Sequence, residues 1–184
     1  YADCLTNIND LNSIRMLTPK YLKSISFGRN FTSTWDKNIL PDSVEVIVFH
    51  PKSKFNYNMA AINLPTKLKK IYFNAAYDKP IDNLPDSLEI ISFCKNSRFN
   101  RFIKKYPRNL KEIYLGDYYT HPLKNMGKNI ELIHFSNNAV FNNLIEYPPS
   151  LEKIYYGMRF NQIIDTLLLN STTIKMIKFA NQSV

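Results

Sequence analysis

Apolar residues recur along the chain in one six-residue pattern, Leu-x-x-Ile-x-Phe, with a period of 20–24 residues. The first and last positions vary among aliphatic and aromatic residues, whereas the central isoleucine is present in every copy. Two copies extend to nearly identical decapeptides, LPDSVEVIVF from Leu40 and LPDSLEIISF from Leu84. The central isoleucines of the eight copies are Ile25, Ile47, Ile71, Ile91, Ile113, Ile133, Ile154 and Ile177.

The pattern predicts one short strand in each copy. Side chains alternate between the two faces of a strand, so the two apolar residues of Ile-x-Phe lie on the same face. A single strand cannot bury that face alone, and neighbouring copies therefore have to stack, with their strands paired in parallel. Proline precedes six of the copies and predicts a fixed turn before each strand, at Pro19, Pro41, Pro65, Pro85, Pro107 and Pro148.

The period also limits what connects the strands. Roughly 15 residues remain in each copy for the return, too few for a long helix and two loops, and a repeat of this length on an L-x-x-L-x-L frame is typical of leucine-rich repeats. We therefore expect a leucine-rich-repeat-like, right-handed solenoid of about eight coils with one short-stranded parallel β-sheet. Its convex side should be extended or irregular, with few short helical turns.

A second motif recurs in the return segments: an aromatic residue, then Asn, with an aliphatic residue four positions after the aromatic. It occurs as FNRFI from Phe99, FNNLI from Phe141 and FNQII from Phe160, and FNYNM from Phe55 is close. Variants without the Asn are FTSTW from Phe31, YDKPI from Tyr77 and YTHPL from Tyr119. Together the two motifs resemble the FNIP repeat family, a relative of the leucine-rich repeats, over roughly residues 17–182.

The resemblance implies a protein-interaction module. In that family, which occurs in amoebae and in the large DNA viruses that infect them, the repeats often follow an F-box and choose the substrate of a ubiquitin ligase. The abundance of residues with AT-rich codons agrees with such a source. No F-box is recognisable within the 184 residues, so the ligase role would depend on a part of the protein outside this sequence.

The repeats divide the chain in two. Residues 1–17 contain Leu5, Ile8, Leu11 and Ile14 at three-residue spacing, which predicts an N-terminal cap or the remnant of an upstream domain. Residues 18–184 form the solenoid. The eighth copy ends at Phe179 with only ANQSV after it. Because a last coil normally needs a cover, we expect the natural chain to continue or its end to pair with another molecule in end-to-end self-association.

The residues on either side of each central isoleucine alternate onto the exposed face of the sheet, where a partner would bind. The third, fifth and seventh copies each carry a charged residue before the isoleucine and Tyr after it, whereas the second, fourth and sixth copies carry an aliphatic residue before it. Tyr114, His134 and Tyr155 should form three successive rungs, close enough for ring contacts. We hypothesise a partner-binding strip, the alternative being a ladder that only stabilises the sheet. Its residues are Lys70, Tyr72, Glu112, Tyr114, His134, Lys153 and Tyr155.

A further row of charged residues follows the first apolar position of each copy. Their signs alternate over most of the row, so neighbouring coils should attract one another and keep their register. The residues are Lys69, Glu89, Lys111, Glu131, Glu152 and Lys175.

The formal net charge of +9 suggests an alternative function, a basic scaffold that binds nucleic acid through dispersed lysines. Eighteen of the 24 basic residues are Lys, and no run of four basic residues occurs. The charge is therefore spread out, and we favour the protein-binding hypothesis.

The sequence offers no catalytic constellation, and we expect a non-enzymatic protein without cofactor or metal. His50, His121 and His134 fall at different positions of different coils, so they do not converge. The few glycines include Gly28, Gly116 and Gly157, directly after strands, and we assign them to backbone turns.

The cysteine content and the hydropathy indicate where the protein works. Two cysteines, Cys4 and Cys94, are too few for a disulfide framework and fit a reducing compartment, so we expect a cytoplasmic location. No apolar run approaches the ~18 residues needed to cross a bilayer, so we expect no membrane partner.

Overall fold

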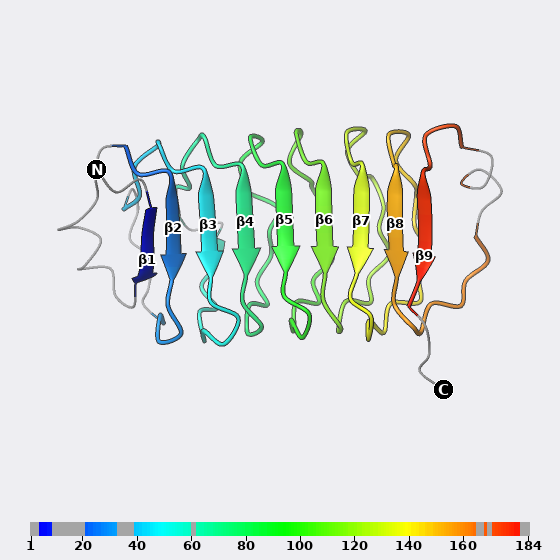
Figure 1. The fold of residues 1–184 in the computed structure, drawn as a ribbon, viewed down its shortest axis with the longest axis horizontal. Helices are drawn as coiled ribbons and strands as arrows, with labels where there is room; N and C mark the ends of the chain where they lie inside the picture. The colour runs from blue at the N-terminus through cyan, green and yellow to red at the C-terminus, as the bar shows by residue number, and fades with distance from the viewer. Residues whose placement is uncertain are drawn as a thin grey trace.

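Nine parallel strands form one sheet, and they lie side by side in the order of the sequence (Figure 1). The computed structural model describes residues 4–8, 21–32, 39–59, 62–164, 168 and 171–180, and residues 4–8 by their backbone alone. The strands are β1 (Cys4–Ile8), β2 (Ser24–Phe27), β3 (Val46–Phe49), β4 (Lys70–Phe73), β5 (Ile90–Phe93), β6 (Glu112–Leu115), β7 (Leu132–Phe135), β8 (Lys153–Tyr156) and β9 (Met176–Phe179).

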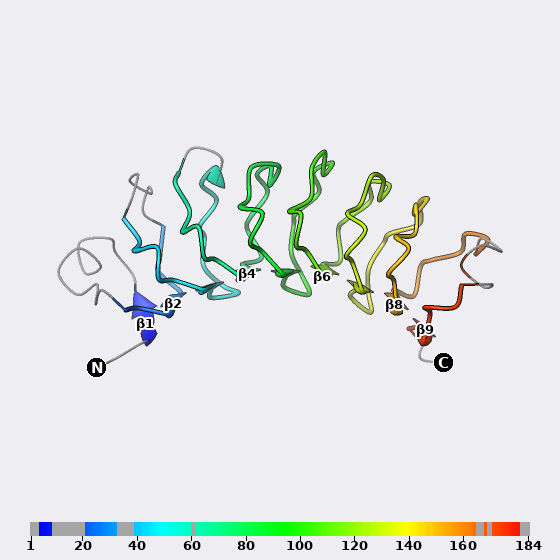
Figure 2. The ribbon, with the colours of Figure 1, turned by 90° about the horizontal axis from the view of Figure 1, so that it is seen from above.

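The coils are arranged along an arc, with the sheet on its inner, concave side and the return segments fanning outward (Figure 2). The strands run in one direction across the sheet, and each connection returns behind it to the next strand, which makes the solenoid right-handed (Figures 1 and 2). Every named element of the described residues is a strand. The predicted fold class is confirmed: a parallel, right-handed solenoid with an extended convex side.

The strands alternate as the sequence pattern predicts. In β4, Ile71 and Phe73 are buried, while Lys70 and Tyr72 lie on the opposite, concave face. The same alternation holds from β2 to β8. The central isoleucines pair directly from β2 to β9, so each coil adds the same side chain at the same level of one continuous core.

The prolines close the predicted turns before the strands. The N–H of Leu68 donates to the carbonyl of Pro65 at 3.1 Å, three residues back, and the first apolar residue then enters the core. The same bond follows Pro41, Pro85, Pro107 and Pro148, and Gly127 takes the place of proline in the sixth coil. Pro19 lies outside the described residues.

Two ladders of aromatic rings run through the core from coil to coil. The return-segment ladder has centroid distances of 5.5 to 6.5 Å between successive coils and is continuous. It consists of Phe31, Phe55, Tyr77, Phe99, Tyr119, Phe141 and Phe160. The strand-end ladder is interrupted at Leu115 and consists of Phe27, Phe49, Phe73 and Phe93, then Phe135, Tyr156 and Phe179.

Coils of two kinds alternate. In the coil of β4, the ring of the return-segment ladder follows the ring of the strand-end ladder by four residues. These rings are Phe73 and Tyr77, with centroids 4.3 Å apart. In the next coil the return-segment ring follows by six residues, as with Phe93 and Phe99, at 4.0 Å. The longer turn contains a small buried residue such as Ser97, whose hydroxyl accepts the N–H of Phe99 at 3.1 Å. The two-coil unit suggested by the paired decapeptides therefore extends to the convex side.

The Asn of the second motif links neighbouring coils. Asn56 Oδ1 accepts the N–H of Asp78 at 2.9 Å, and Asp78 Oδ1 accepts the N–H of Asn100 at 3.1 Å. Asn100 in turn accepts the N–H of Thr120 at 3.0 Å. This Asn thus satisfies a backbone N–H group, and the group belongs to the following coil.

The sheet has one strand more than the eight that the repeats predict. β1 pairs with β2 through Cys4 and Leu5, and the register then shifts before Ile8. This strand lies within residues 1–17, which the sequence placed outside the repeats, and it lacks the Ile-x-Phe pattern. Backbone pairing therefore extends the sheet beyond the repeat pattern, while the boundary at residue 17 stays a prediction.

Two glycines after strands are explained by close packing rather than by backbone freedom. No glycine among the described residues has a positive φ. A Cβ atom on Gly116 would lie 2.7 Å from the carbonyl oxygen of Cys94 and 2.8 Å from Ser97 Cβ, both in the preceding coil. A Cβ on Gly157 would lie equally close to Ser136 and Ala139. These positions set how closely successive coils approach.

We predict that Gly116→Ala destabilises the chain by about 1–3 kcal/mol, because the added methyl group forces two coils apart. Gly127→Ala is the matched control: its Cβ would meet only the carbonyl oxygen of Pro107, at 3.9 Å. There the loss of backbone freedom in the unfolded chain should leave stability unchanged or raised by up to about 1 kcal/mol. Urea denaturation measures both, and equal effects of the two substitutions would contradict the packing explanation.

Candidate functional site

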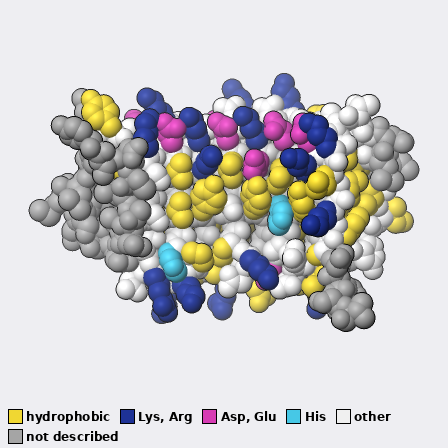
Figure 3. Space-filling view, in the orientation of Figure 1, with side chains coloured by type: hydrophobic (Ala, Val, Ile, Leu, Met, Phe, Trp, Pro, Cys, Tyr) yellow, Lys and Arg dark blue, Asp and Glu magenta, His cyan; other side chains and the backbone are white. Residues whose placement is uncertain are grey.

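The predicted strip lies on the concave face of the sheet. Its residues come from β4, β6, β7 and β8, and all seven side chains are half-buried or exposed. A band of hydrophobic side chains runs along the middle of this face, and cationic and anionic side chains alternate along one of its edges (Figure 3). Strand pairing places Tyr72, Ser92, Tyr114, His134 and Tyr155 in one row.

Three rings of this row are in contact, as predicted. The ring centroids of Tyr114 and His134 are 5.5 Å apart, and those of His134 and Tyr155 are 5.0 Å apart. Tyr72 belongs to the same row, but Ser92 of β5 lies between it and Tyr114. The structure therefore brings three of the predicted aromatics together and leaves the fourth separate.

Hydrogen bonds fix the orientation of two tyrosines. Tyr114 donates its hydroxyl to Glu112 Oε2 at 2.7 Å. Partial burial and this bond raise the pKa of Tyr114 to about 12. Tyr155 donates to Met176 Sδ at 3.1 Å, in the next strand. Tyr114 and Glu112 thus act as one pre-organised unit, and the hydroxyl stays protonated at neutral pH.

Burial keeps the middle of the ladder uncharged. It lowers the pKa of His134 below its usual range, and the positive charge of Lys178 lowers it further. At neutral pH the imidazole is therefore neutral, and the contact of the three rings involves no cation. The strip carries its charges beside this ladder, on Lys70, Glu112 and Lys153.

The charged row beside the strip forms ion pairs between coils. Glu45 accepts hydrogen bonds from both Lys23 Nζ (2.6 Å) and Lys69 Nζ (2.8 Å), which lowers its pKa from 4.5 to about 2. Lys111 pairs with Glu89 and Lys175 with Glu152. Glu45 follows the first apolar residue of its copy, as the others do, and so extends the predicted row by one coil.

The alternation of sign breaks at one place in this row. Glu131 and Glu152 follow one another in adjacent coils, and Glu131 has no ion-pair partner among the described residues. On its other side Glu131 follows Lys111 in the row, but Lys111 pairs with Glu89. Alternating charge stabilises the register of most coils, while the backbone bonds of the sheet maintain it here.

Two adjoining hollows open on the concave face beside Ser92, and nothing in the repeat pattern indicated them. One, of about 320 Å³, is bounded by apolar side chains that include Val48, Pro51 and Tyr72. The other, of about 380 Å³, lies toward Tyr114, His134 and Lys95. Ser92 and Cys94 border both. The hollows exist because Ser92, a small side chain, lies between the large side chains of Tyr72 and Tyr114 in this row.

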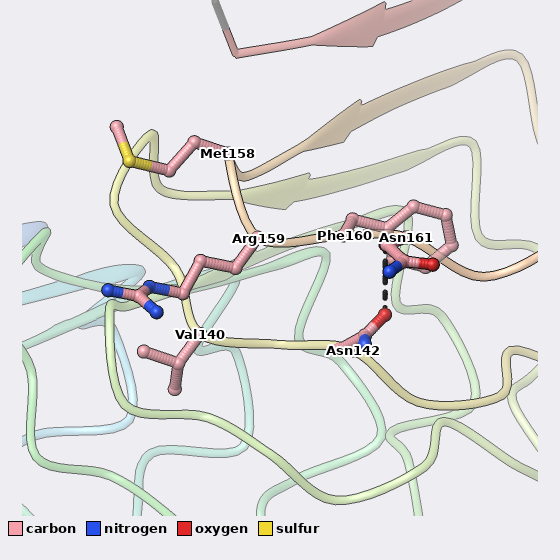
Figure 4. Close-up of a pocket in the computed structure, with 6 residues that line it drawn as sticks. All are labelled: Val140, Asn142, Met158, Arg159, Phe160 and Asn161. Carbon is pink, nitrogen blue, oxygen red and sulfur yellow. Dashed lines mark hydrogen bonds between the residues drawn. The ribbon is translucent and has the colours of Figure 1, made fainter. Parts of the chain in front are cut away.

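A wider hollow of about 730 Å³ lies away from the strip, at the turns that follow β7 and β8 (Figure 4). Val140, Met158 and Arg159 border it, and Asn161 donates its N–H to Asn142 Oδ1 at 2.9 Å. This bond belongs to the series that links coils through the second motif. Apart from Arg159, the lining side chains carry no charge, and no two of them form an acid–base pair.

No cluster of three or more His, Cys, Asp or Glu side chains with metal-binding geometry is found in the part of the chain that the structure describes. The described residues also contain no helix that is long and apolar enough to span a membrane. Cys94 is a free thiol, and burial raises its pKa. The concave strip and its hollows are thus the features that could engage a ligand.

The FNIP Repeat family model matches residues 17–52 and 55–96. These matched segments of the chain are FNIP repeats. The matched segments cover the first three coils with β2, β3 and β4 and reach into the fourth. The later coils continue the same FNIP geometry, because their rings and their Asn bonds occupy equivalent positions. No curated protein matches the chain.

Among solved structures, the FNIP solenoid is similar to the crystal structure of CroV588, described as a novel circular LRR protein. The TM-score is 0.66 at 22% sequence identity, and the match covers 85% of this chain but 26% of the other. This chain thus spans about a quarter of that protein's length. At this identity the likeness establishes a leucine-rich-repeat-like fold.

We predict that Glu45→Gln lowers the free energy of unfolding at neutral pH. The folded-state pKa of about 2 lies below the ordinary 4.5, so the carboxylate stabilises the fold above pH 4.5, and this contribution is lost as pH falls toward 2. The difference in the free energy of unfolding between wild type and variant should therefore shrink as the pH falls from 4.5 toward 2. Urea denaturation at several pH values measures it.

Glu131→Gln is the matched control, because it removes a carboxylate of the same row that has no ion-pair partner among the described residues. It should leave the free energy of unfolding at neutral pH nearly unchanged. If Glu45→Gln and Glu131→Gln gave the same dependence on pH, the bonds from Lys23 and Lys69 would not be the cause.

Proposed function

We propose that this FNIP solenoid is a non-enzymatic protein-binding module that holds its partner on the concave strip formed by Lys70, Tyr72, Glu112, Tyr114, His134, Lys153 and Tyr155. The observation that carries the proposal is the row of half-exposed rings on a face with fixed register. Rigid aromatic side chains lose little entropy on binding and are frequent energetic centres of protein interfaces. Solenoids commonly bind on the surface that their curvature creates.

The finer role follows from the resemblance described above. We infer that the partner is a substrate of an F-box ubiquitin ligase in the cytoplasm, chosen by these repeats. The two cysteines and the likeness to FNIP repeats support this inference. The test is to remove the natural protein from cells. The level of the captured partner should then rise, and the partner should carry less ubiquitin.

Nucleic-acid binding is the alternative, and the arrangement of the basic side chains favours it less. Five basic side chains already pair with carboxylates of neighbouring coils: Lys23, Lys69, Lys111, Lys175 and Arg101. Glu112 and the acidic members of the charged row also lie on or beside the strip, where they would repel phosphates. A strand of nucleic acid would need a continuous positive groove instead.

We predict that the triple substitution Tyr72/Tyr114/Tyr155→Ala reduces partner recovery at least tenfold in pull-downs from host lysate, because it removes the rings that would anchor the interface. The matched control is Tyr21/Phe102/Tyr118→Ala, which removes three exposed rings outside the strip. Loss of the ladder contacts should cost only about 0.5–1.5 kcal/mol per ring pair, so both variants should stay folded in thermal melts.

Equal recovery by wild type and the strip variant would mean that the ladder only stabilises the sheet. Salt separates the two classes of partner, because each phosphate neutralised by a basic side chain releases counterions. Binding that falls steeply between low and physiological salt, and is competed by nucleic acid, would favour the basic-scaffold alternative.

The exposed last strand supports a second proposal, end-to-end self-association. Met176 and Phe179 of β9 are 43% and 45% exposed, whereas Tyr156, which occupies in β8 the position of Phe179, is buried beneath the next coil. The edge strand of a parallel sheet has unpaired backbone groups, and with apolar side chains it favours pairing with a strand of another molecule. We expect the molar mass to rise with concentration in light scattering, and Phe179→Lys to abolish the rise. A concentration-independent monomer would refute the proposal.

A further inference from the structure

The aromatic row of the concave face has one vacant rung. Tyr72 of β4 pairs with Ser92 of β5, and Ser92 pairs with Tyr114 of β6. Beyond Tyr114 the row continues through His134 to Tyr155 with rings in contact. Ser92 therefore stands where a ring would complete the series, and it is the only small side chain between two tyrosines of the row in the described strands.

The space left by this rung is open and mainly apolar. The two hollows of about 320 and 380 Å³ meet at Ser92 and Cys94. Tyr72 borders the first and Tyr114 the second, so the two tyrosines stand on opposite sides of the gap. The floor at this level is a half-buried strand that carries Ile90 and Ser92.

The width of the gap matches one aromatic ring. Two strand spacings separate Tyr72 from Tyr114 by about 9–10 Å. A ring placed midway would have its centroid about 4.5–5 Å from each tyrosine, a distance at which aromatic pairs are stable. The observed distances of 5.0 and 5.5 Å in the neighbouring rungs show that this sheet accepts such spacing.

Two lysines, Lys70 and Lys95, flank the gap, and the carboxylate of Asp117, whose charge acts on Cys94, accepts the hydroxyl of Ser136. Lys70 pairs in register with Ile90 at one end of the gap, and Lys95 borders the hollow at the other end. Neither has an ion-pair partner in the described part of the chain. The nearby carboxylate of Glu112 is engaged by the hydroxyl of Tyr114. The surroundings therefore favour acidic groups beside an inserted ring.

We propose that the gap at Ser92 receives one aromatic side chain of a partner polypeptide, inserted between Tyr72 and Tyr114, with acidic residues next to it that meet Lys70 and Lys95. This inference rests on the proposed function, and it names the chemistry of the partner at one point of the strip. A nucleobase has the same planar shape, but the hollow toward Tyr72 is lined almost wholly by apolar side chains, which leave the polar edge of a base without hydrogen-bond partners. These features favour a peptide.

Three acetylated pentapeptides test the proposal, each with two Asp and two Glu residues around a central Trp, Leu or Ala. Their binding to the isotope-labelled chain is followed by NMR titration. Ser92→Tyr fills the vacant rung, and the sheet should accept it because Tyr72 and Tyr114 occupy equivalent positions. Ser26→Tyr introduces the same side chain in the same row three strands away, in β2, and is the matched control.

We expect the Trp peptide to shift the amide signals around Ser92, to bind the Ser26→Tyr variant equally well, and to bind the Ser92→Tyr variant at least tenfold more weakly. The Ala peptide should bind the wild type at least tenfold more weakly than the Trp peptide. Thermal melting of Ser92→Tyr at or above the wild-type temperature shows that the variant is folded.

Three results would overturn the proposal. The first two are no binding of the Trp peptide at millimolar concentration and equal binding of that peptide to wild type and Ser92→Tyr. The third is binding of a single-stranded RNA oligonucleotide to the wild type that the Ser92→Tyr substitution abolishes. The proposed strip is judged separately. If the Tyr72/Tyr114/Tyr155→Ala variant loses its partner while Ser92→Tyr keeps it, the strip is the interface and the gap is not its anchor point.

Discussion

Stacking of each coil on the next is the interaction on which the rest of this structure depends. A coil of about two dozen residues has one apolar strand face and cannot bury it alone. Burial comes from the neighbouring coils, so equivalent side chains have to meet at equivalent levels. The central isoleucines and the two ring ladders satisfy this requirement, with ring centroids 5.0 to 6.5 Å apart from coil to coil.

The same requirement explains the polar residues of the repeat. Each return segment has backbone groups that no regular strand pairing satisfies, and side chains of the adjacent coil complete them. Asn56 and Asp78 accept N–H groups of the following coil, while Ser87 donates its hydroxyl to the carbonyl of Leu68 at 2.7 Å. The charged row adds ion pairs between coils at the surface. Because these bonds repeat with the period of the core, the concave face is a rigid platform on which the exposed side chains are fixed.

The exposed residues are freed from this requirement and can vary from coil to coil. In the row after the central isoleucine, four coils carry an aromatic ring or imidazole, and the other four carry Ser26, Val48, Ser92 and Lys178. A substitution at these positions leaves the packing of the core unchanged, and it alters the shape and charge of the surface. The gap at Ser92, between Tyr72 and Tyr114, is one result. Such positions give a repeat protein its specificity, because the invariant positions are already committed to stacking.

Much of this architecture was determined by the sequence alone. A period of 20–24 residues and the alternation in Ile-x-Phe place Ile71 and Phe73 inside and Tyr72 outside, whatever surrounds them, because side-chain direction in a strand is a local property. The contacts of Tyr114, His134 and Tyr155 followed from the same register. Only the tertiary structure decided what depends on neighbours across coils. Glu45 lies between two lysines, Gly116 has no room for a Cβ, and β1 joins the sheet without the motif. The hollows beside Ser92 belong to this second group, since an empty space is defined by the side chains around it, and those around each hollow come from three different coils.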